Sequence, residues 1–239
     1  MGSKARIAKH ILPLMLKNRQ PYQYYIEPMC GGCNLIDKVD GNRIANDINP
    51  YLIAMFRSLQ VGWVPPTPIG RAYYNEVRRS YNNKERLYPD NEIGYVGFIA
   101  SYNGRFFDGG YSGQVITKNG SLRDYIAESR ENIMKQIPLL KDVVFSCCDY
   151  KDMIISERSI IYYDPPYNGV KKYSYSINHS EFWEHCRKQV SEGHRVFISE
   201  YSAPEDFVCI WSGEIKTPIN QTITKIAVER LFVHESQLN

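Results

Sequence analysis

Ser159-Ile160-Ile161-Tyr162-Tyr163-Asp164-Pro165-Pro166-Tyr167 is the stretch that decides how this chain of 239 residues is interpreted. Its first five residues form an apolar run typical of a buried strand. The two prolines lack amide hydrogens and have a fixed φ, so the strand cannot continue through them. Asp164, the Pro165 carbonyl and the Tyr167 ring suit an exocyclic amino group and the face of a nucleobase. An ordinary strand end has the same pattern, so the rest of the chain must decide between the two interpretations.

Strand-like and helical runs alternate along most of the chain. The strands are expected at residues 24–26, 43–46, 143–147, 160–163 and 196–199, with closing strands at 207–211 and 227–233. The helices are expected at residues 5–17, 51–60 and around 182–190. This alternation predicts an α/β fold with a mixed, mostly parallel sheet, helices on both faces, and functional sites at the carboxyl ends of the strands.

An insertion is expected to begin at the segment Trp63-Val64-Pro65-Pro66-Thr67-Pro68, which breaks the alternation. It holds helical runs near residues 69–81, 92–102 and 121–137, around a glycine-rich segment at 103–111. We therefore predict one domain built from residues 1–62 and 141–239. Residues 63–140 form a mainly helical insertion with a hairpin or loop.

Charge and apolar patterning restrict the partners. Lys plus Arg number 29 against 26 Asp plus Glu, a mild excess that permits a polyanionic partner, and the basic residues near 71–86 alternate with tyrosines. No apolar run has the length of a membrane span, and the N-terminus lacks the pattern of a signal peptide. We expect a soluble protein in the cytoplasm of a bacterial or phage-infected cell.

Six cysteines include a C-x-x-C pair at Cys30 and Cys33. No second C-x-x-C or H-x-x-x-H follows to complete four zinc ligands. We therefore expect reduced, mostly buried thiols and no metal.

Glu27-Pro28-Met29-Cys30-Gly31-Gly32 follows the first predicted strand, and Asp47 follows the second. The glycines let a ligand approach the backbone, and an acid at the second strand end can accept both hydroxyls of a ribose. A small adenosyl ligand fits this arrangement. Two alternatives remain open: the glycines can form a simple turn, and Asp47 can cap the helix that begins near Pro50.

The order of these motifs resembles that of the α-group N6-adenine DNA methyltransferases, the Dam-like or D12 class, nearly end to end. The region between the cofactor motifs and the catalytic motif corresponds to target recognition, and its segment Ser101 to Tyr111 resembles a phage and Gram-positive variant more than the enterobacterial enzymes. Gly2-Ser3-Lys4, Glu27 to Gly32, Asn46-Asp47-Ile48-Asn49, Asp149-Tyr150, Asp164 to Tyr167 and Val228-Glu229-Arg230-Leu231-Phe232 are similar to family motifs. Met29 and Cys33 depart from the family pattern.

The resemblance implies a Rossmann-like methyltransferase that uses S-adenosylmethionine. The implied cofactor-binding residues are Lys4, Glu27, Pro28, Cys30, Gly31, Gly32, Asp47, Asp149, Tyr150 and Asp164. The implied catalytic residues are Asp164, Pro165, Pro166 and Tyr167.

The chemistry of the catalytic residues follows from adenine itself. The lone pair of N6 is delocalised into the ring, so N6 is a poor nucleophile. If Asp164 and the Pro165 carbonyl accept both amino hydrogens, the nitrogen can pyramidalise and charge developing on it is stabilised. Tyr167 stacks on the base, which must leave the duplex because N6 cannot be reached inside it.

Double-stranded DNA is the expected partner. The candidate contact residues are Arg78, Arg79, Lys84, Asn103, Arg105, Phe106, Lys171, Lys172 and Tyr173. Exposed basic residues on a helix are also a common solvated face. A cognate restriction endonuclease can act separately, and the oligomeric state and recognised sequence stay open. The rival functions are RNA adenine or DNA cytosine-N4 methylation, and a non-catalytic DNA-binding relative.

Overall fold

The computed structural model describes residues 4–117, 119–167, 177–218 and 224–238 and divides the chain into two compact units. The sheet unit comprises Lys4–Asn46 and Asp149–Asn239. Among the described residues, the helical unit comprises Asp47–Cys148. The boundaries predicted for the insertion, residues 63 and 140, delimit the residues expected to recognise the target. They stay a prediction.

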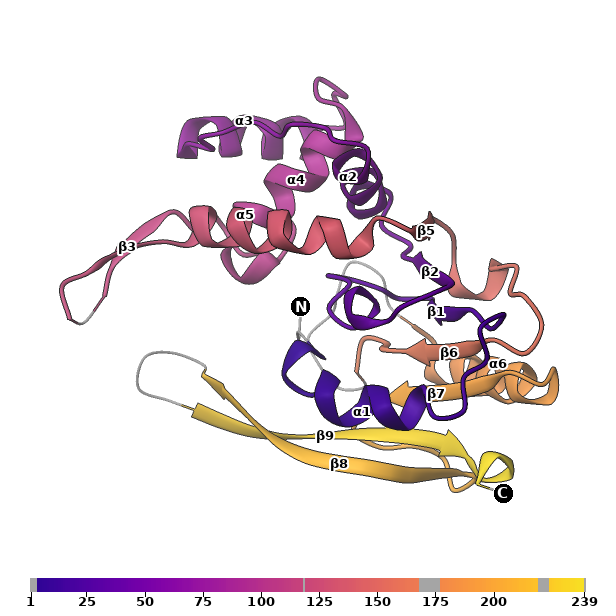
Figure 1. Ribbon diagram of the computed structural model, residues 1–239. Helices are drawn as coiled ribbons and strands as arrows, with labels where there is room; N and C mark the ends of the chain where they lie inside the picture. Colours follow the sequence, from indigo (N-terminus) through magenta and orange to yellow (C-terminus); the bar gives the residue numbers. More distant parts are fainter. Residues whose placement is uncertain (1–3, 118, 168–176, 219–223, 239) are drawn as a thin grey trace. The chain divides into compact units, whose positions relative to one another are not determined.

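Six strands of the sheet unit lie in the order β2-β1-β6-β7-β9-β8 (Figure 1). They are β1 (Tyr25–Glu27), β2 (Arg43–Asn46), β6 (Ile160–Tyr163), β7 (Arg195–Ser199), β8 (Phe207–Pro218) and β9 (Thr224–His234). The first four are parallel, whereas β9 is antiparallel to both β7 and β8. The predicted mixed, mostly parallel α/β sheet is therefore confirmed.

The register of the strands places the carboxyl ends of β1 and β6 at the same edge of the sheet. Ile26 of β1 pairs with Ile161 of β6, and Tyr163 pairs with Ile198 of β7. Glu27 and Asp164 therefore both lie at the carboxyl ends of their strands. In β9, Leu231 pairs with Ser199 at the end of β7. Because β9 runs the other way, the residues that precede Leu231 extend beyond that same edge.

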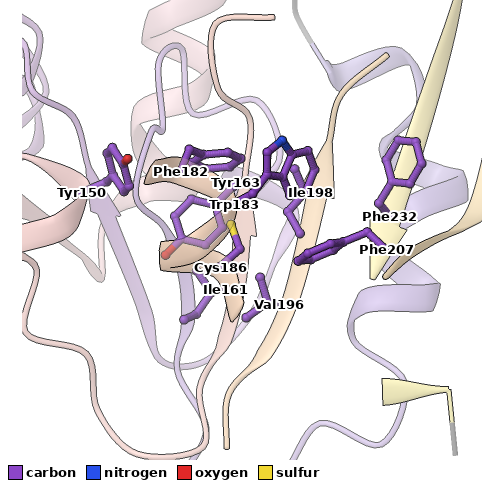
Figure 2. Close-up of a cluster of buried hydrophobic side chains, with 10 residues drawn as sticks. All are labelled: Tyr150, Ile161, Tyr163, Phe182, Trp183, Cys186, Val196, Ile198, Phe207 and Phe232. Carbon is purple, nitrogen blue, oxygen red and sulfur yellow. The ribbon is translucent and has the colours of Figure 1, made fainter. Parts of the chain in front are cut away.

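An aromatic cluster forms the core beneath this edge (Figure 2). Tyr163 of β6 packs edge-on against Phe182, and Trp183 packs against Phe207 of β8. Phe182 and Trp183 belong to α6 (His179–Ser191), whose N-cap Asn178 accepts the amides of the first turn. The short helix η1 (Lys4–Arg6) and α1 (Ala8–Met15) open the unit, and α1 buries Ile11 and Met15. The elements η2 (Ile36–Lys38), η5 (Tyr150–Asp152) and η6 (Glu235–Gln237) are single 3₁₀ turns.

The helical unit is arranged around α4 (Asp90–Ile99). This helix packs against α2 (Pro50–Gln60), α3 (Arg71–Asn82) and α5 (Tyr125–Gln136). Gly94 is required by the close α2 contact, since a Cβ at this position would lie 2.0 Å from the Tyr51 carbonyl oxygen. The unit also holds β5 (Val143–Ser146), η3 (Tyr102–Gly104) and η4 (Ile137–Leu140).

A small hairpin occupies part of a segment for which the sequence predicts helix. Strands β3 (Gln114–Ile116) and β4 (Leu122–Asp124) pair antiparallel, and α5 begins only at Tyr125. The Asp124 side chain accepts the amides of Ile126 and Ala127, so this cap fixes the helix start. The expectation of helix over residues 121–124 is therefore wrong.

Across the described ranges, no helix has the length and apolar character needed to cross a membrane.

Candidate functional site

Asp164 stands directly after β6, at the carboxyl edge of the sheet unit. Its side chain is 23% exposed, and Pro165 behind it is buried. A carboxylate that is largely removed from water needs hydrogen-bond donors or a cation beside it. Its neighbours therefore indicate what the site is built to do.

Lys4 supplies the cation. Its Nζ lies 3.0 Å from Asp164 Oδ1 and 3.3 Å from Glu229 Oε2, and it donates to the Tyr167 hydroxyl. The Lys4 residue is only 7% exposed, although lysine is rarely buried unless it is paired. The structure thus brings together two predicted catalytic residues, the predicted cofactor-binding Lys4, and Glu229.

Tyr167 is held by its hydroxyl and by its ring. The hydroxyl donates to Glu229 Oε2 at 2.6 Å, and the ring meets Tyr201 edge to face at 4.5 Å between centroids. Burial raises the pKa of Tyr167 well above its usual range, and the negative charges of Asp164 and Glu229 raise it further. Tyr167 is therefore a neutral phenol with a fixed ring orientation.

The cluster carries two carboxylates and one ammonium. Burial by itself lowers the pKa of Lys4, but Asp164 and Glu229 raise it above its ordinary value. The pKa of Asp164 is raised, first by burial and then by Glu229, although Lys4 opposes this shift. With both acids ionised the cluster has a net charge of about −1, which favours a cationic partner.

Glu27 is a buried acid at the end of β1. Its Oε1 accepts from the Tyr25 hydroxyl at 3.1 Å, and the residue is 4% exposed. Burial raises the pKa of Glu27 to about 8; the Tyr25 hydrogen bond lowers it, and the charges of Asp164 and Asp37 add to the rise. Within the described residues no Lys, Arg or His forms an ion pair with Glu27. A positive charge beside Glu27 would therefore stabilise its ionised form.

The turn after Glu27 has the conformation that its glycines suggest. Gly31 has φ +48°, a left-handed value, and the Cys30 amide donates to the Asn46 carbonyl at 2.8 Å. The Asn46 side chain returns a hydrogen bond to the Pro28 carbonyl at 3.0 Å. These contacts join the turn to the end of β2.

The burial of the cysteines differs from one to the next. Cys30, Cys33 and Cys186 are buried thiols, but Cys147 and Cys209 are exposed, so the thiols are not all buried.

Asp47 is not the helix cap that was considered as its alternative role. Asn49 caps α2, because its Oδ1 accepts the amides of Tyr51 at 3.0 Å and Leu52 at 3.3 Å. Asp47 Oδ1 instead accepts the Asn49 amide at 2.9 Å and so shapes the turn between β2 and α2. The role of Asp47 in cofactor binding stays a prediction.

Asp149 and Tyr150 are placed differently from each other. Asp149 accepts the Lys151 amide at 3.0 Å in the turn that begins η5. Tyr150 is buried in the core cluster, where it packs edge-on against Phe182 and His185. Burial raises its pKa to about 12, so its hydroxyl is neutral near pH 7. A cofactor contact by either residue stays a prediction.

The predicted DNA-contact residues of the helical unit differ in their surroundings. Arg79 and Lys84 are exposed, whereas Arg78 is half-buried on α3. Arg105 forms an ion pair with Asp108 at 2.6 Å. The Phe106 ring packs against Tyr51, Tyr81, Phe98 and Phe107, which is a structural role whatever else it does. Asn103 is exposed with φ +56°, and Lys171, Lys172 and Tyr173 lie outside the described residues.

Glu229 is the member of the cluster that sequence reasoning did not select. It lies in β9, in the segment Val228-Glu229-Arg230-Leu231-Phe232, which was interpreted only as the closing strand. No local signal selects it, because Arg230 follows it directly in the sequence and 65 residues separate it from Asp164. Which partner it has depends on the antiparallel course of β9.

The sequence matches the profile of a known family. The profile of the family described as D12 class N6 adenine-specific DNA methyltransferase matches residues 1–210. Among solved structures, the chain is similar to SMU.472, a proposed methyltransferase crystallised with SAH, at 12% identity and a TM-score of 0.36. That match covers 97% of this chain and 52% of the other, so the chain spans about half the length of that protein. The family match covers most of the sequence, and the chain therefore belongs to the D12 class N6 adenine-specific DNA methyltransferase family.

Proposed function

We propose that this protein transfers a methyl group to the N6 amino group of an adenine in DNA. The observation that carries the proposal is the environment of Asp164: a strand-end carboxylate, followed by two prolines, that shares one buried ammonium with a second carboxylate. A carboxylate can accept about four hydrogen bonds, and among the described side chains Lys4 and Tyr167 are the hydrogen-bond partners of Asp164. Asp164 therefore keeps capacity for an incoming amino group.

S-adenosylmethionine is the methyl donor of this family. It supplies a methyl group activated by a positively charged sulfur, which leaves as a neutral thioether. Two features of the chain fit this ligand. Glu27 is a buried carboxylate without an ion-pair partner among the described residues, and Gly31 provides a left-handed turn that lets a ligand approach the backbone. We assign Glu27 and the Gly31 turn to the cofactor.

The residues around Asp164 act on the amino group. Asp164 accepts one amino hydrogen and the Pro165 carbonyl accepts the other, so N6 turns its lone pair toward the methyl group. As the new N–C bond forms, positive charge builds on N6, and the net negative cluster of Lys4, Asp164 and Glu229 stabilises it. An amino proton then leaves to water. The fixed Tyr167 ring stacks on the base and orients it in line with the donor.

A DNA substrate requires the adenine to leave the helix, because the site must surround N6. This conclusion and the choice of DNA over RNA, or of adenine over cytosine, belong to the proposal. A non-catalytic relative is disfavoured by the complete hydrogen-bonded cluster, since a relative without catalysis has no need to keep a buried lysine between two acids.

The direct test is to express the protein in cells that lack adenine methylation and to sequence their DNA with detection of modified bases. We expect N6-methyladenine at one consensus sequence, and none with an Asp164→Ala variant. Methylcytosine, or methylation confined to RNA, would replace the proposal by one of its rivals. An absence of any methylation by purified protein supplied with cofactor and the same DNA would refute catalysis.

Contact with the DNA backbone is proposed for a cavity of the helical unit. Tyr51, Tyr81 and Tyr88 line it together with Lys84 and Arg86. The two basic residues have φ values of +57° and +53°, which residues with side chains rarely adopt. Strain of this kind often accompanies a binding function. Neither residue has an ion-pair partner within the described part of the chain.

Lys84→Ala and Arg86→Ala are each expected to weaken DNA binding and to reduce the slope of log Kd against log salt by about 1. Each lost phosphate contact releases one counterion fewer, so the weakening should be similar for cognate and unrelated DNA. Fluorescence anisotropy between low and moderate salt measures both quantities. Lys141→Ala, an exposed lysine of the same unit, is the matched control, and equal slopes for all variants would remove this surface from the interface.

A further inference from the structure

We infer that Glu229 is a positioning residue of the methyl-transfer site, which holds Lys4 and Tyr167 so that Asp164 stays available to the base. The inference rests on the proposed function. Nothing in the motif that contains Asp164 points to Glu229, which lies 65 residues later in a different strand. The contacts of its carboxylate carry the argument.

The course of β9 brings Glu229 to the site. Leu231 pairs with Ser199, the last residue of β7, and β9 runs antiparallel to β7. Glu229 precedes Leu231 by two residues, so it lies on the same side of the sheet plane and one step beyond the carboxyl end of β7. Figure 1 shows β9 continuing past the ends of the parallel strands. A parallel closing strand would present this residue position at the opposite edge.

The hydrogen bonds of Lys4 explain why Glu229 matters. An ammonium has three N–H groups, and Lys4 places oxygens of Asp164, Glu229 and Tyr167 around its Nζ. The Tyr167 hydroxyl accepts from Lys4 and donates to Glu229 at 2.6 Å. Lys4, Tyr167 and Glu229 thus close a cycle in which every member is held twice. Asp164 lies outside this cycle, and its side-chain partners are Lys4 and the Tyr167 hydroxyl.

Removal of the Glu229 charge changes what Asp164 can do. The Lys4 ammonium then has a single carboxylate beside it and pairs with Asp164 alone. A tighter ion pair holds the acceptor away from the amino group and cancels the negative charge that favours the transition state. Tyr167 also loses the anionic acceptor that fixes its ring. Glu229 therefore shares the Lys4 ammonium with Asp164 and so weakens the Lys4–Asp164 ion pair. A residue that only supports the fold would not have this effect.

The charged and titratable groups that face Asp164 come from five elements. They are Lys4 of η1, Glu27 of β1, Tyr162 of β6, Tyr167 of the segment after β6, and Glu229 of β9. The Glu229 charge raises the pKa of Asp164, whereas Lys4 lowers it. If transfer requires ionised Asp164, the acid limb of the rate profile reports this balance.

The experiment measures the single-turnover rate of methyl transfer against pH for the wild type, Glu229→Gln and Tyr167→Phe. For Glu229→Gln we expect the rate to fall by about 10- to 100-fold and the acid limb to move to lower pH, because a negative neighbour of Asp164 is lost. The cofactor Kd should change by less than about threefold. Tyr167→Phe removes the same hydrogen bond and keeps the Glu229 charge, so its rate also falls. Because the Tyr167 hydroxyl lowers the pKa of Asp164, the acid limb of this variant should move to higher pH, opposite to that of Glu229→Gln.

Each outcome has one meaning. An active wild type with a Glu229→Gln variant of unchanged rate and acid limb overturns the inference and leaves the proposed function intact. A wild type without adenine methylation overturns the proposed function itself. If Glu229→Gln does not fold, Glu229→Asp decides, because it keeps the charge but shortens the side chain that reaches Lys4 and Tyr167. An unchanged rate overturns the positioning role, whereas a reduced rate with a native unfolding transition supports it.

Discussion

Asp164→Ala is expected to lower the single-turnover rate of methyl transfer by about 10³-fold or more, with the cofactor Kd within about threefold of the wild type. The variant removes the acceptor that localises the N6 lone pair and one of the two negative charges around Lys4. Lys4 then pairs with Glu229, so the site becomes neutral. The transition state loses its stabilisation, while the glycine turn and Glu27 keep their contacts.

Asp164→Asn is the matched variant, because it preserves the volume and one acceptor oxygen. Its amide group brings hydrogens that oppose both Lys4 and the amino group of the base, so we expect a rate near that of the alanine variant. Transfer of a radiolabelled methyl group under single-turnover conditions gives the rate, and calorimetry gives the cofactor Kd. Substantial turnover by both variants would exclude Asp164 as the acceptor. A large loss of cofactor affinity would assign it to cofactor binding instead.

Much of the sheet could be predicted from the chain because its strands have strong local patterns. The run Ile160–Tyr163 is apolar throughout, as a strand buried on both faces must be, and the prolines after it fix its end. Arg43–Asn46 was expected at the bounds that the structure shows. Once parallel order is assumed, the carboxyl ends of neighbouring strands meet at one edge, so Glu27 and Asp164 could be placed near each other.

The contacts within the site could not be predicted, because they depend on tertiary geometry. Lys4 and Tyr167 are separated by 163 positions, and Tyr167 and Glu229 by 62. No local pattern shows which buried lysine lies between which acids. The same holds for Asp47 and Asn49: both are good caps, and only the backbone geometry before α2 selects Asn49.

A hairpin or loop was expected in the insertion, but the position of the β3–β4 hairpin could not be predicted, for a different reason. Leu122 is 66% exposed and Ile116 is 75% exposed, so these residues do not show the alternation of a half-buried strand. The helical pattern of α5 continues up to them, and only the Asp124 cap separates the two elements. A short exposed hairpin next to a helix has little signal of its own.

The largest expected effect on stability concerns Glu27. Its pKa is raised from 4.5 to about 8 in the folded protein, mainly by burial. Between these two values the folded state retains a proton that the unfolded state has released. The free energy of unfolding contributed by Glu27 is therefore complete below about pH 4.5, falls as the pH rises, and is lost above about pH 8.

Glu27→Gln removes this dependence, because glutamine is neutral at every pH and its side-chain oxygen can still accept from Tyr25. Relative to the wild type, the variant should gain up to about 5 kcal/mol of unfolding free energy between pH 5 and pH 9. Urea titrations across this range measure the difference. Glu205→Gln, a change at an exposed acid of the same unit, controls for the loss of a charge and should give a curve parallel to the wild type.

The same variant also tests the role of Glu27 toward the cofactor. If a positively charged ligand lies beside this carboxylate, binding favours its ionised form and releases a proton below about pH 8. Calorimetry in buffers of different ionisation enthalpy should detect the proton with the wild type and lose it with Glu27→Gln, whose cofactor affinity also falls at pH 8. A stabilised variant that binds the cofactor with unchanged affinity and proton release would show that Glu27 is a buried acid without a ligand. Stability and binding then separate the two reasons for which a chain can keep a buried carboxylate that has no ion-pair partner among its described residues.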